Sequence, residues 1–262
     1  MIDKTTSLAK AIGYIKDGQI IGLGGLTIYR RPVAFVVALI KSPDPPRNLT
    51  IFSFTGGLAA DLLVGAGLVN KTITCYFGFE IFGLAPMFSS AANAGTLEII
   101  EESEASIAAG LRAKMAGVGF MPSTAWQGTD MQSIRPDVKS IVDPYTGHLL
   151  SAFPAISCDV AIIHVLRADR FGNCILGGNP TIDSELADIA DVTIITAEEV
   201  VDKLPGPIDI SGHAVTRVVH CRQGAWPTSC YPLYPIDGEE FLRYIDSCNQ
   251  GNFSDFVMSF PL

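Results

Sequence analysis

Apolar, β-branched runs alternate with segments of helical periodicity along the 262 residues of the sequence, and this alternation constrains the fold most strongly. Several runs are apolar at every position, as strands are when helices cover both faces of a parallel sheet. We therefore predict an α/β fold with an open, mostly parallel sheet covered by helices, in one continuous domain over residues 1–262. The predicted strands occupy residues 19–23, 49–54, 72–77, 97–101, 159–165, 192–196 and 214–220.

Three helix starts and ends can be proposed between these strands. Apolar spacing over residues 8–15 predicts a helix that ends at Gly18, because glycine commonly follows the last helical turn. Pro32 suits the first turn of the next helix, and Ser103 is placed to cap a helix that begins at Glu104. Open parallel sheets bind ligands outside the carboxyl ends of their strands, so the loops after the strands are the place to look for chemistry.

Composition excludes several classes of partner. The chain has 27 acidic residues against 18 Lys and Arg, which argues against nucleic acid as a partner. Six cysteines without a CxxC pair, and four histidines without ligand spacing, indicate reduced thiols and no metal site. The apolar run Val33–Ile40 is too short to span a membrane, and no signal peptide is recognisable, so we expect a cytoplasmic protein. The 48% of hydrophobic residues suggests contact with another chain.

The first predicted strand runs into a glycine-rich loop over residues 22–32. Gly24 and Gly25 would let backbone N–H groups approach an anion, and Arg30 and Arg31 would add positive charge. The loop lacks the third glycine of a dinucleotide fingerprint and the GK[ST] of a phosphate-binding loop. The alternative is a tight turn with two solvated arginines.

Two more strands are followed by glycines. Gly56 and Gly57 follow one of them, and the loop 77–83 with Phe79 and Glu80 follows the next. Glycines at successive strand ends suggest a backbone crowded against a ligand, although glycine turns also form for steric reasons alone. Glu80 could act as a base or repel an anionic substrate, and the alternative is a solvated loop acid.

The segment 98–104 contains four glutamates, and such a run is usually a solvated face. Glu104 differs, because it lies where a strand gives way to a helix, and we expect it to be partly buried with a raised pKa. Gln127 and Gly128 occupy another glycine-rich turn, where the amide could bind a carbonyl or carboxylate group, or simply belong to a surface loop. The sequence shows no complete nucleophilic apparatus.

Residues 17–32 resemble the α-subunit signature of family I coenzyme A transferases, with Leu26 at a position where phenylalanine is usual. Three further segments, 159–173, 194–199 and 224–237, resemble the glutaconate-type α subunits. The resemblance extends over nearly the whole chain. It implies the α/β fold of these transferases and the role of an α subunit.

In that family the α subunit pairs with a homologous β subunit, usually as α2β2, and the active site lies at their interface. The resemblance implies CoA transfer between an acyl-CoA and a (di)carboxylic acid, with no permanently bound cofactor. The nucleophile is then a glutamate of the β subunit, which forms an acyl anhydride and next a glutamyl-CoA thioester. Gly24 and Gly25 would stabilise the thioester oxyanion, and Arg30 and Arg31 would hold a free carboxylate.

Two alternatives accompany this prediction. Glutaconate-type relatives include ring-opening hydrolases and a decarboxylase of acyl-CoA substrates, and in the hydrolases a glutamate that matches Glu104 takes part in catalysis. Because the glutaconate transferase carries an amide there, Glu104 makes hydrolysis or decarboxylation an alternative to transfer. A further alternative is a non-catalytic sensor of an acyl-CoA or a sugar phosphate.

Overall fold

The computed structural model describes residues 2–261 and contains a nine-stranded, mostly parallel central sheet. All neighbouring strands along the sheet are parallel, and β12 (Cys174–Ile175) alone pairs in the antiparallel sense, with β11. The strand order is β1 (Thr5–Thr6), β14 (Arg217–His220), β13 (Ala190–Val201), β11 (Cys158–Asp169), β2 (Ile20–Leu23), β3 (Leu49–Phe52), β5 (Val69–Thr74) and β7 (Glu98–Glu101). The predicted α/β fold with an open parallel sheet is confirmed.

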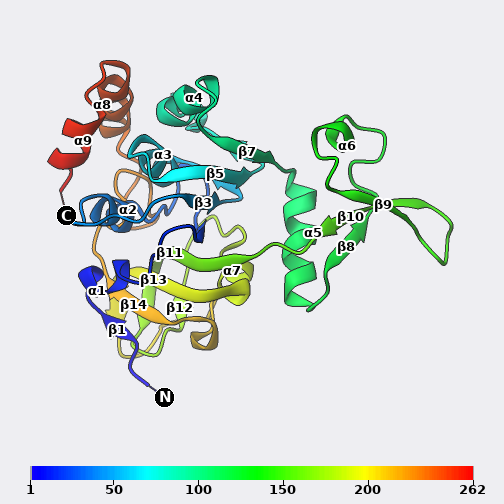
Figure 1. Ribbon diagram of the computed structural model, residues 1–262. Helices are drawn as coiled ribbons and strands as arrows, with labels where there is room; N and C mark the ends of the chain where they lie inside the picture. The colour runs from blue at the N-terminus through cyan, green and yellow to red at the C-terminus, as the bar shows by residue number, and fades with distance from the viewer. Residues whose placement is uncertain (1, 262) are drawn as a thin grey trace.

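Helices cover both faces of this sheet (Figure 1). One face packs on α1 (Leu8–Ile12), α2 (Val33–Ile40), α3 (Leu58–Gly65), α8 (Gly238–Asn249) and α9 (Phe253–Ser259). The other face packs on α5 (Glu104–Met115) and α7 (Asp183–Ile189). Within β11, Val160 and Ile162 belong to the first core, and Ala161 and Ile163 belong to the second. This division explains why the central strands are apolar at every position.

Several predicted boundaries are wrong: β3 ends at Phe52 rather than at residue 54, β11 and β13 extend beyond 159–165 and 192–196, and β14 begins at Arg217 rather than at residue 214. Two other predictions differ more. The segment 72–77 is not one strand, because the central sheet ends at Thr74 and β6 (Tyr76–Phe77) pairs instead with β4 (Thr55–Gly56) in a small sheet of its own. The first helix ends at Ile12 rather than near Gly18, because Gly13 already ends the regular hydrogen bonding and turns carry the chain onward. Ser103 caps α5, as predicted, whereas Pro32 lies at the N-cap of α2 rather than in its first turn.

Residues 118–157, called the arm below, project from the main body beyond α5 (Figure 1). They form a separate antiparallel sheet in the order β8 (Phe120–Ser123), β10 (Leu149–Pro154) and β9 (Lys139–Val142), with the short helix α6 (Met131–Ile134). The root of the arm packs on α5 through a small core of Ala109, Trp126, Val138 and Phe153. The remaining elements are α4 (Pro86–Asn93) and the 3-10 helices η1 (Glu80–Phe82) and η2 (Gly212–Ala214).

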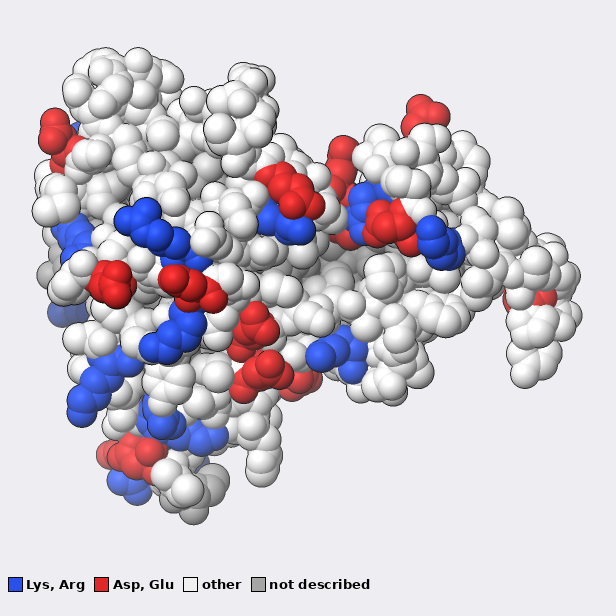
Figure 2. Space-filling view, in the orientation of Figure 1, with Lys and Arg blue, Asp and Glu red and all other residues white. Residues whose placement is uncertain are grey.

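Charged side chains of both signs are interspersed over the face of the molecule seen in Figure 2. Between residues 2 and 261, none of the helices has the length and apolar character needed to cross a membrane.

Candidate active site

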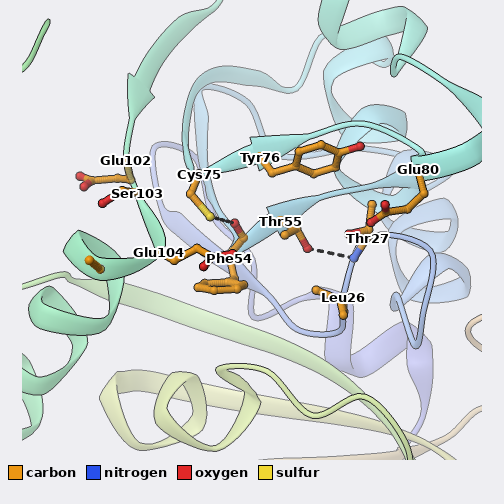
Figure 3. A pocket seen from close by; sticks show the side chains of 11 residues that line it. Leu26, Thr27, Phe54, Thr55, Cys75, Tyr76, Glu80, Glu102, Ser103 and Glu104 are labelled. Atoms are coloured by element: carbon orange, nitrogen blue, oxygen red, sulfur yellow. Dashed lines mark hydrogen bonds between the residues drawn. The ribbon is translucent and has the colours of Figure 1, made fainter. Parts of the chain in front are cut away.

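A cavity of about 720 Å³ opens at the carboxyl ends of four adjacent strands (Figure 3). Each strand supplies the residues that directly follow it, as expected for an open parallel sheet. The lining residues are Leu26 and Thr27 after β2, Phe54 and Thr55 after β3, Cys75, Tyr76 and Glu80 after β5, and Glu102, Ser103, Glu104 and Ala105 after β7. The sheet topology thus brings together residues up to 79 positions apart, from 26 to 105.

Three glutamates line this cavity, and two of them were predicted site residues. Glu102 pairs with Arg135 of the arm at 2.5 Å. Glu80 and Glu104 form no ion pair with any residue in the described part of the chain, and both are exposed. The expectation that Glu104 is partly buried is therefore wrong for this chain alone, because the first turn of α5 faces the open cavity. Unpaired carboxylates can accept a proton or a hydrogen bond from a ligand.

The position of Glu104 is fixed by the residue before it. The Ser103 side chain accepts a hydrogen bond from the Ser106 backbone N–H at 3.2 Å, and the Ser106 hydroxyl accepts one from the Ser103 N–H at 2.8 Å, which completes a capping box. The Trp126 indole of the arm donates to the Ser103 hydroxyl at 2.7 Å. Glu104 thus follows a residue that is hydrogen-bonded both to α5 and to the arm.

Cys75 is the thiol in the cavity lining. Its Sγ lies 2.9 Å from the Phe54 carbonyl oxygen. Burial, and next the negative charge of Glu104, raise the pKa of Cys75 to about 11. Because the thiolate is the reactive form of cysteine, this thiol is a poor nucleophile at neutral pH.

Arg30 and Arg31 are directed into the protein rather than toward the cavity. Arg30 pairs with the buried Asp183 at 2.9 Å, and although burial opposes ionisation, Arg30 holds the pKa of Asp183 below its usual range. The remaining bonds go to backbone carbonyls: those of His164, Gly178 and Asn179 for Arg30, and those of Leu23, Gly24, Gly25 and Thr55 for Arg31. Burial lowers the pKa of Arg31 to about 10.

Both guanidinium groups are at most 1% exposed. Neither the expected carboxylate contact nor the alternative of two solvated arginines describes them. The loop that carries them is a tight turn closed by the arginines themselves.

The glycines of the loops likewise serve the fold. Gly25 has φ +82°, and its N–H donates to the Asp183 carboxylate at 2.7 Å, while the Gly24 N–H donates to the Ile162 carbonyl at 3.0 Å. Both predicted oxyanion donors are therefore occupied. Side chains at Gly56 and Gly57 would collide with the Phe77 ring and the Thr27 carbonyl, respectively, so these glycines allow segments of the chain to cross.

Three other predicted residues lie away from the cavity lining. Phe79 is fully buried and packs edge-on against Phe241 of α8. Gln127 donates to the Ser151 hydroxyl at 3.0 Å within the arm, and Gly128 adopts a turn with φ +74° beside it. Of all the predicted site residues, only Glu80 and Glu104 line the cavity.

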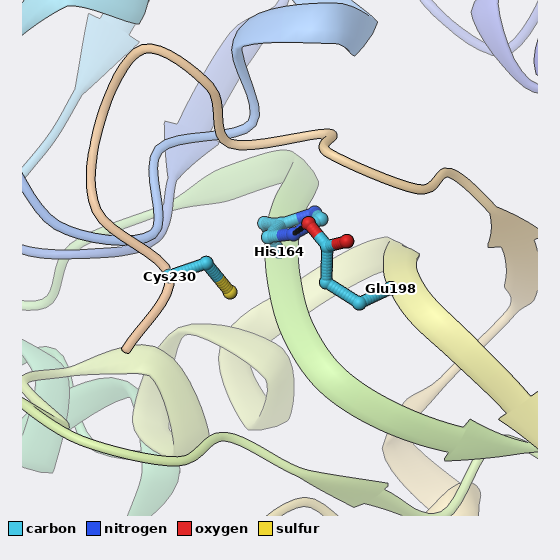
Figure 4. Close-up of side chains that lie close together, drawn as sticks. All are labelled: His164, Glu198 and Cys230. Carbon is cyan, nitrogen blue, oxygen red and sulfur yellow. Dashed lines mark hydrogen bonds and ion pairs between the residues drawn. The ribbon is translucent and has the colours of Figure 1, made fainter. Parts of the chain in front are cut away.

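A buried polar group surrounds Glu198, and no motif in the sequence indicates it (Figure 4). His164 of β11 uses both ring nitrogens, on Thr196 and Glu198 of β13, at 2.9 Å each. Glu198 also accepts hydrogen bonds from the Tyr234 hydroxyl and from the backbone N–H groups of residues 223 and 224. Although the Cys230 thiol lies close by, these bonds show a structural link that ties residues 223–234 to the sheet.

A family model described as Coenzyme A transferase matches residues 5–220, most of the chain. The chain belongs to the coenzyme A transferase family. Its resemblance to the glutaconate-type α subunits is confirmed by the crystal structure of glutaconate coenzyme A-transferase from Acidaminococcus fermentans. That structure is 30% identical, with a TM-score of 0.87, and the match covers 97% of this chain and 87% of that one.

Other proteins resemble this chain in structure or in sequence. The crystal structure of the decarboxylase AibA/AibB matches with a TM-score of 0.91 at 30% identity and 98% coverage of both chains. The A-type chain of the 3-oxoadipate CoA-transferase of Pseudomonas knackmussii is 31% identical over 93% of both chains. The IpdA chain of a cholesterol ring-cleaving hydrolase from Rhodococcus jostii is 32% identical over 76% of this chain and 69% of its own. The chain spans 56% of the length of a relative from Archaeoglobus fulgidus.

Proposed function

We propose that this coenzyme A transferase family member is the α-type subunit of a heteromeric enzyme that transfers CoA between an acyl-CoA and a carboxylic acid. The observation that carries the proposal is the cavity at the carboxyl ends of β2, β3, β5 and β7, in a chain whose relatives are named as the A-type chains of such transferases. The whole chain acts as one subunit and forms an α2β2 assembly with a homologous β subunit in the cytoplasm. It binds the CoA thioester as substrate without a resident cofactor.

In this assembly the partner's glutamate supplies the nucleophile, as the family resemblance implies. The thioester carbonyl then faces the partner, and the cavity of this chain receives the acyl group. Glu80 and Glu104 line that space from opposite sides in the view of Figure 3. The carboxylates of this chain are thus placed to set which acyl group enters and to exchange a proton with it.

Hydrolysis or decarboxylation is the second candidate, and the placement of Glu104 favours it specifically. Glu104 lies in the cavity wall without an ion pair in the described part of the chain, held by the capped start of α5. A carboxylate so placed could activate water or abstract a proton next to a thioester carbonyl. The similarity to a decarboxylase and to a hydrolase chain supports this candidate.

One experiment separates the two candidates. The chain is co-expressed with a homologous β-type subunit, and the purified complex is incubated with hexanoyl-CoA and glutaconyl-CoA, with and without acetate. Mass spectrometry follows the thioesters and the free acids. Acetyl-CoA that forms only with acetate establishes transfer, whereas free CoA or a decarboxylated thioester formed regardless of acetate establishes the second candidate.

Variants of the same complex test the role of Glu104. Under hydrolysis, Glu104→Gln abolishes turnover, since the group that accepts a proton from water is lost. Under decarboxylation it does so because the group that gives a proton to the carbanion is lost. Under transfer, Glu104→Gln raises KM more than it lowers kcat. Glu101→Gln is the matched control, because Glu101 is exposed nearby on β7 and does not line the cavity. Full activity of Glu104→Gln with every thioester would remove Glu104 from the site.

A further inference from the structure

The loop that carries Glu80 presents two large apolar side chains to solvent. Within residues 79–84, called the mouth loop below, Ile81 is 89% exposed and Leu84 is 75% exposed. The loop borders the cavity, because Glu80 belongs to the cavity lining. Single exposed apolar side chains are common on protein surfaces, whereas an apolar patch beside a cavity is typical of a binding surface.

The other apolar side chains of the mouth loop are packed against α8. Phe79 is fully buried, with its ring edge-on to Phe241 at 5.5 Å between centroids. Phe82 stacks on the same ring at 5.1 Å. The fold therefore anchors the loop through its two phenylalanines and leaves Ile81 and Leu84 outside.

The backbone of the mouth loop holds these two side chains in place. The Phe79 N–H donates to the Gly83 carbonyl at 2.8 Å, and the Gly83 N–H donates to the Glu80 carbonyl at 3.1 Å, so the turn closes on itself. Glu80 has φ +54°, a conformation that residues other than glycine seldom adopt, and Gly83 has φ +93°. Such backbone conformations are typical of functional sites, and a preformed surface loses little conformational entropy on binding.

The cavity beside the mouth loop indicates what covers this surface. Under the proposed function, a glutamate of the β-type partner enters the cavity and attacks the thioester. That glutamate can enter only if its own chain covers the mouth of the cavity, and this chain then lies against the mouth loop. Tyr76, an exposed lining residue, extends toward Glu80 in Figure 3 and continues the apolar surface into the cavity. A second copy of this chain in the same place would keep the β-type partner out.

We propose that the mouth loop is a docking surface for the β-type partner, which receives Ile81 and Leu84 in an apolar pocket next to its glutamate. The inference rests on the proposed function, because it assumes that a partner completes this site. Association is favoured in proportion to the apolar area removed from water. The buried centre of an interface is also more apolar than its periphery, so these two side chains mark the centre of the contact.

The test uses the co-expressed complex of the two chains. Sedimentation velocity over a dilution series measures the dissociation constant of the contact between them. Ile81→Asp and Leu84→Asp should each raise this constant about tenfold or more, because they place a charge in an apolar contact. Ile81→Leu keeps the apolar volume and should assemble as the wild type does. Unchanged assembly of both aspartate variants overturns the inference.

Met258→Asp is the matched control. Met258 is 70% exposed on α9, and its carbonyl accepts a hydrogen bond at 3.1 Å from Lys41, the residue directly after α2. Because α2 connects the parallel strands β2 and β3, it runs back along the sheet, and its end lies at the edge opposite the cavity. Met258→Asp should therefore leave the dissociation constant unchanged. A loss as large as that of Ile81→Asp would overturn the assignment to the mouth loop.

A second measurement does not depend on how well a charged variant folds. A photoreactive p-benzoylphenylalanine in place of Ile81 should crosslink to the β-type chain when the complex is irradiated, and the same group in place of Met258 should not. Crosslinks from position 81 to a second copy of this chain, or none to the β-type chain, contradict the inference.

The outcomes also separate this inference from the proposed function. A complex that assembles through the mouth loop but turns over no CoA ester supports the docking surface and contradicts the proposed function. If the aspartate variants assemble normally but raise KM for every CoA ester, the mouth loop binds the thioester, and the inference is wrong. If the wild-type chain forms no complex with the β-type chain, both proposals fail.

Discussion

Two regions that follow strands of the central sheet carry charged side chains. One is the glycine-rich loop, residues 22–32, and the other is the acidic wall of the cavity, formed by Glu80 and Glu104. In the loop, Arg30 and Arg31 are buried; Arg30 bonds to Asp183 and to backbone carbonyls, and Arg31 bonds to backbone carbonyls. In the wall, Glu80 and Glu104 are exposed and have no ion-pair partner between residues 2 and 261. The comparison shows that charged side chains near a site have two roles. Buried, paired groups stabilise the backbone of the site, whereas exposed groups without an ion pair can contact a ligand.

The largest loss of stability is expected for Asp183→Ala, which removes the buried carboxylate that binds the glycine-rich loop. Asp183→Ala leaves Arg30 without a counter-ion and the Gly25 N–H without an acceptor. We expect the free energy of unfolding to fall by about 3–5 kcal/mol, the usual cost of breaking a buried ion pair. Urea denaturation measures this loss. As control, Arg167→Ala breaks the exposed pair with Glu199 and should cost less than about 1 kcal/mol.

Asp61 of α3 is a third kind of carboxylate, buried but not ion-paired within the described residues. It accepts hydrogen bonds from the Tyr244 hydroxyl at 2.7 Å and from the Phe88 N–H at 2.6 Å, which joins α3 to α8 and α4. Burial raises the pKa of Asp61 to about 6. Because the folded state then holds a proton that the unfolded state releases at lower pH, the stability this group contributes falls as the pH rises from about 4 to 6.

Asp61→Asn removes this pH dependence. Relative to wild type, the variant should gain about 2 kcal/mol of unfolding free energy between pH 4 and pH 7, most of what a shift of about two pKa units supplies. Denaturation curves at pH 4, 5, 6 and 7 measure the difference. A constant difference across this range would show that folding does not shift the pKa of Asp61.

A smaller effect is expected at the cap of α5. Ser103→Ala removes the acceptor for the Ser106 N–H and for the Trp126 indole. The loss of a helix cap costs about 1 kcal/mol. Thermal unfolding measures the stability, and a shift of KM or kcat in the same complex would show that the cap also positions Glu104. Ser7→Ala, at the cap of α1, is the control for a cap far from the cavity.

The smallest change in stability is expected for the wall itself. Glu80→Gln and Glu104→Gln should each alter the free energy of unfolding by less than about 1 kcal/mol, because both side chains are exposed. Their effects on turnover, expressed as free energies of activation, should be much larger than these changes in stability. Strong destabilisation by either variant would show that the glutamates of the wall, like the arginines of the loop, stabilise the fold.

The sequence predicts the sheet well, since buried parallel strands are apolar at every position and Ser103 caps its helix through local contacts. It does not predict that Arg30 and Arg31 are buried, because Asp183, the ion-pair partner of Arg30, lies about 150 residues away in the chain. The burial of the Thr27 hydroxyl without a hydrogen-bond partner in the described part of the chain is not predicted, because it depends on how the loops pack in the folded structure. No strand is predicted between residues 101 and 159, where the arm lies, because its antiparallel pairing is long-range and its strands are partly exposed.

The arm has a mechanical consequence for the cavity. Its outermost hairpin ends in Tyr145, which is 96% exposed, whereas its root binds Ser103 through Trp126 and Glu102 through Arg135. The root of the arm therefore holds the two residues directly before Glu104. The position of this carboxylate thus depends on contacts made by a segment that follows it in the chain and whose far end is open to solvent.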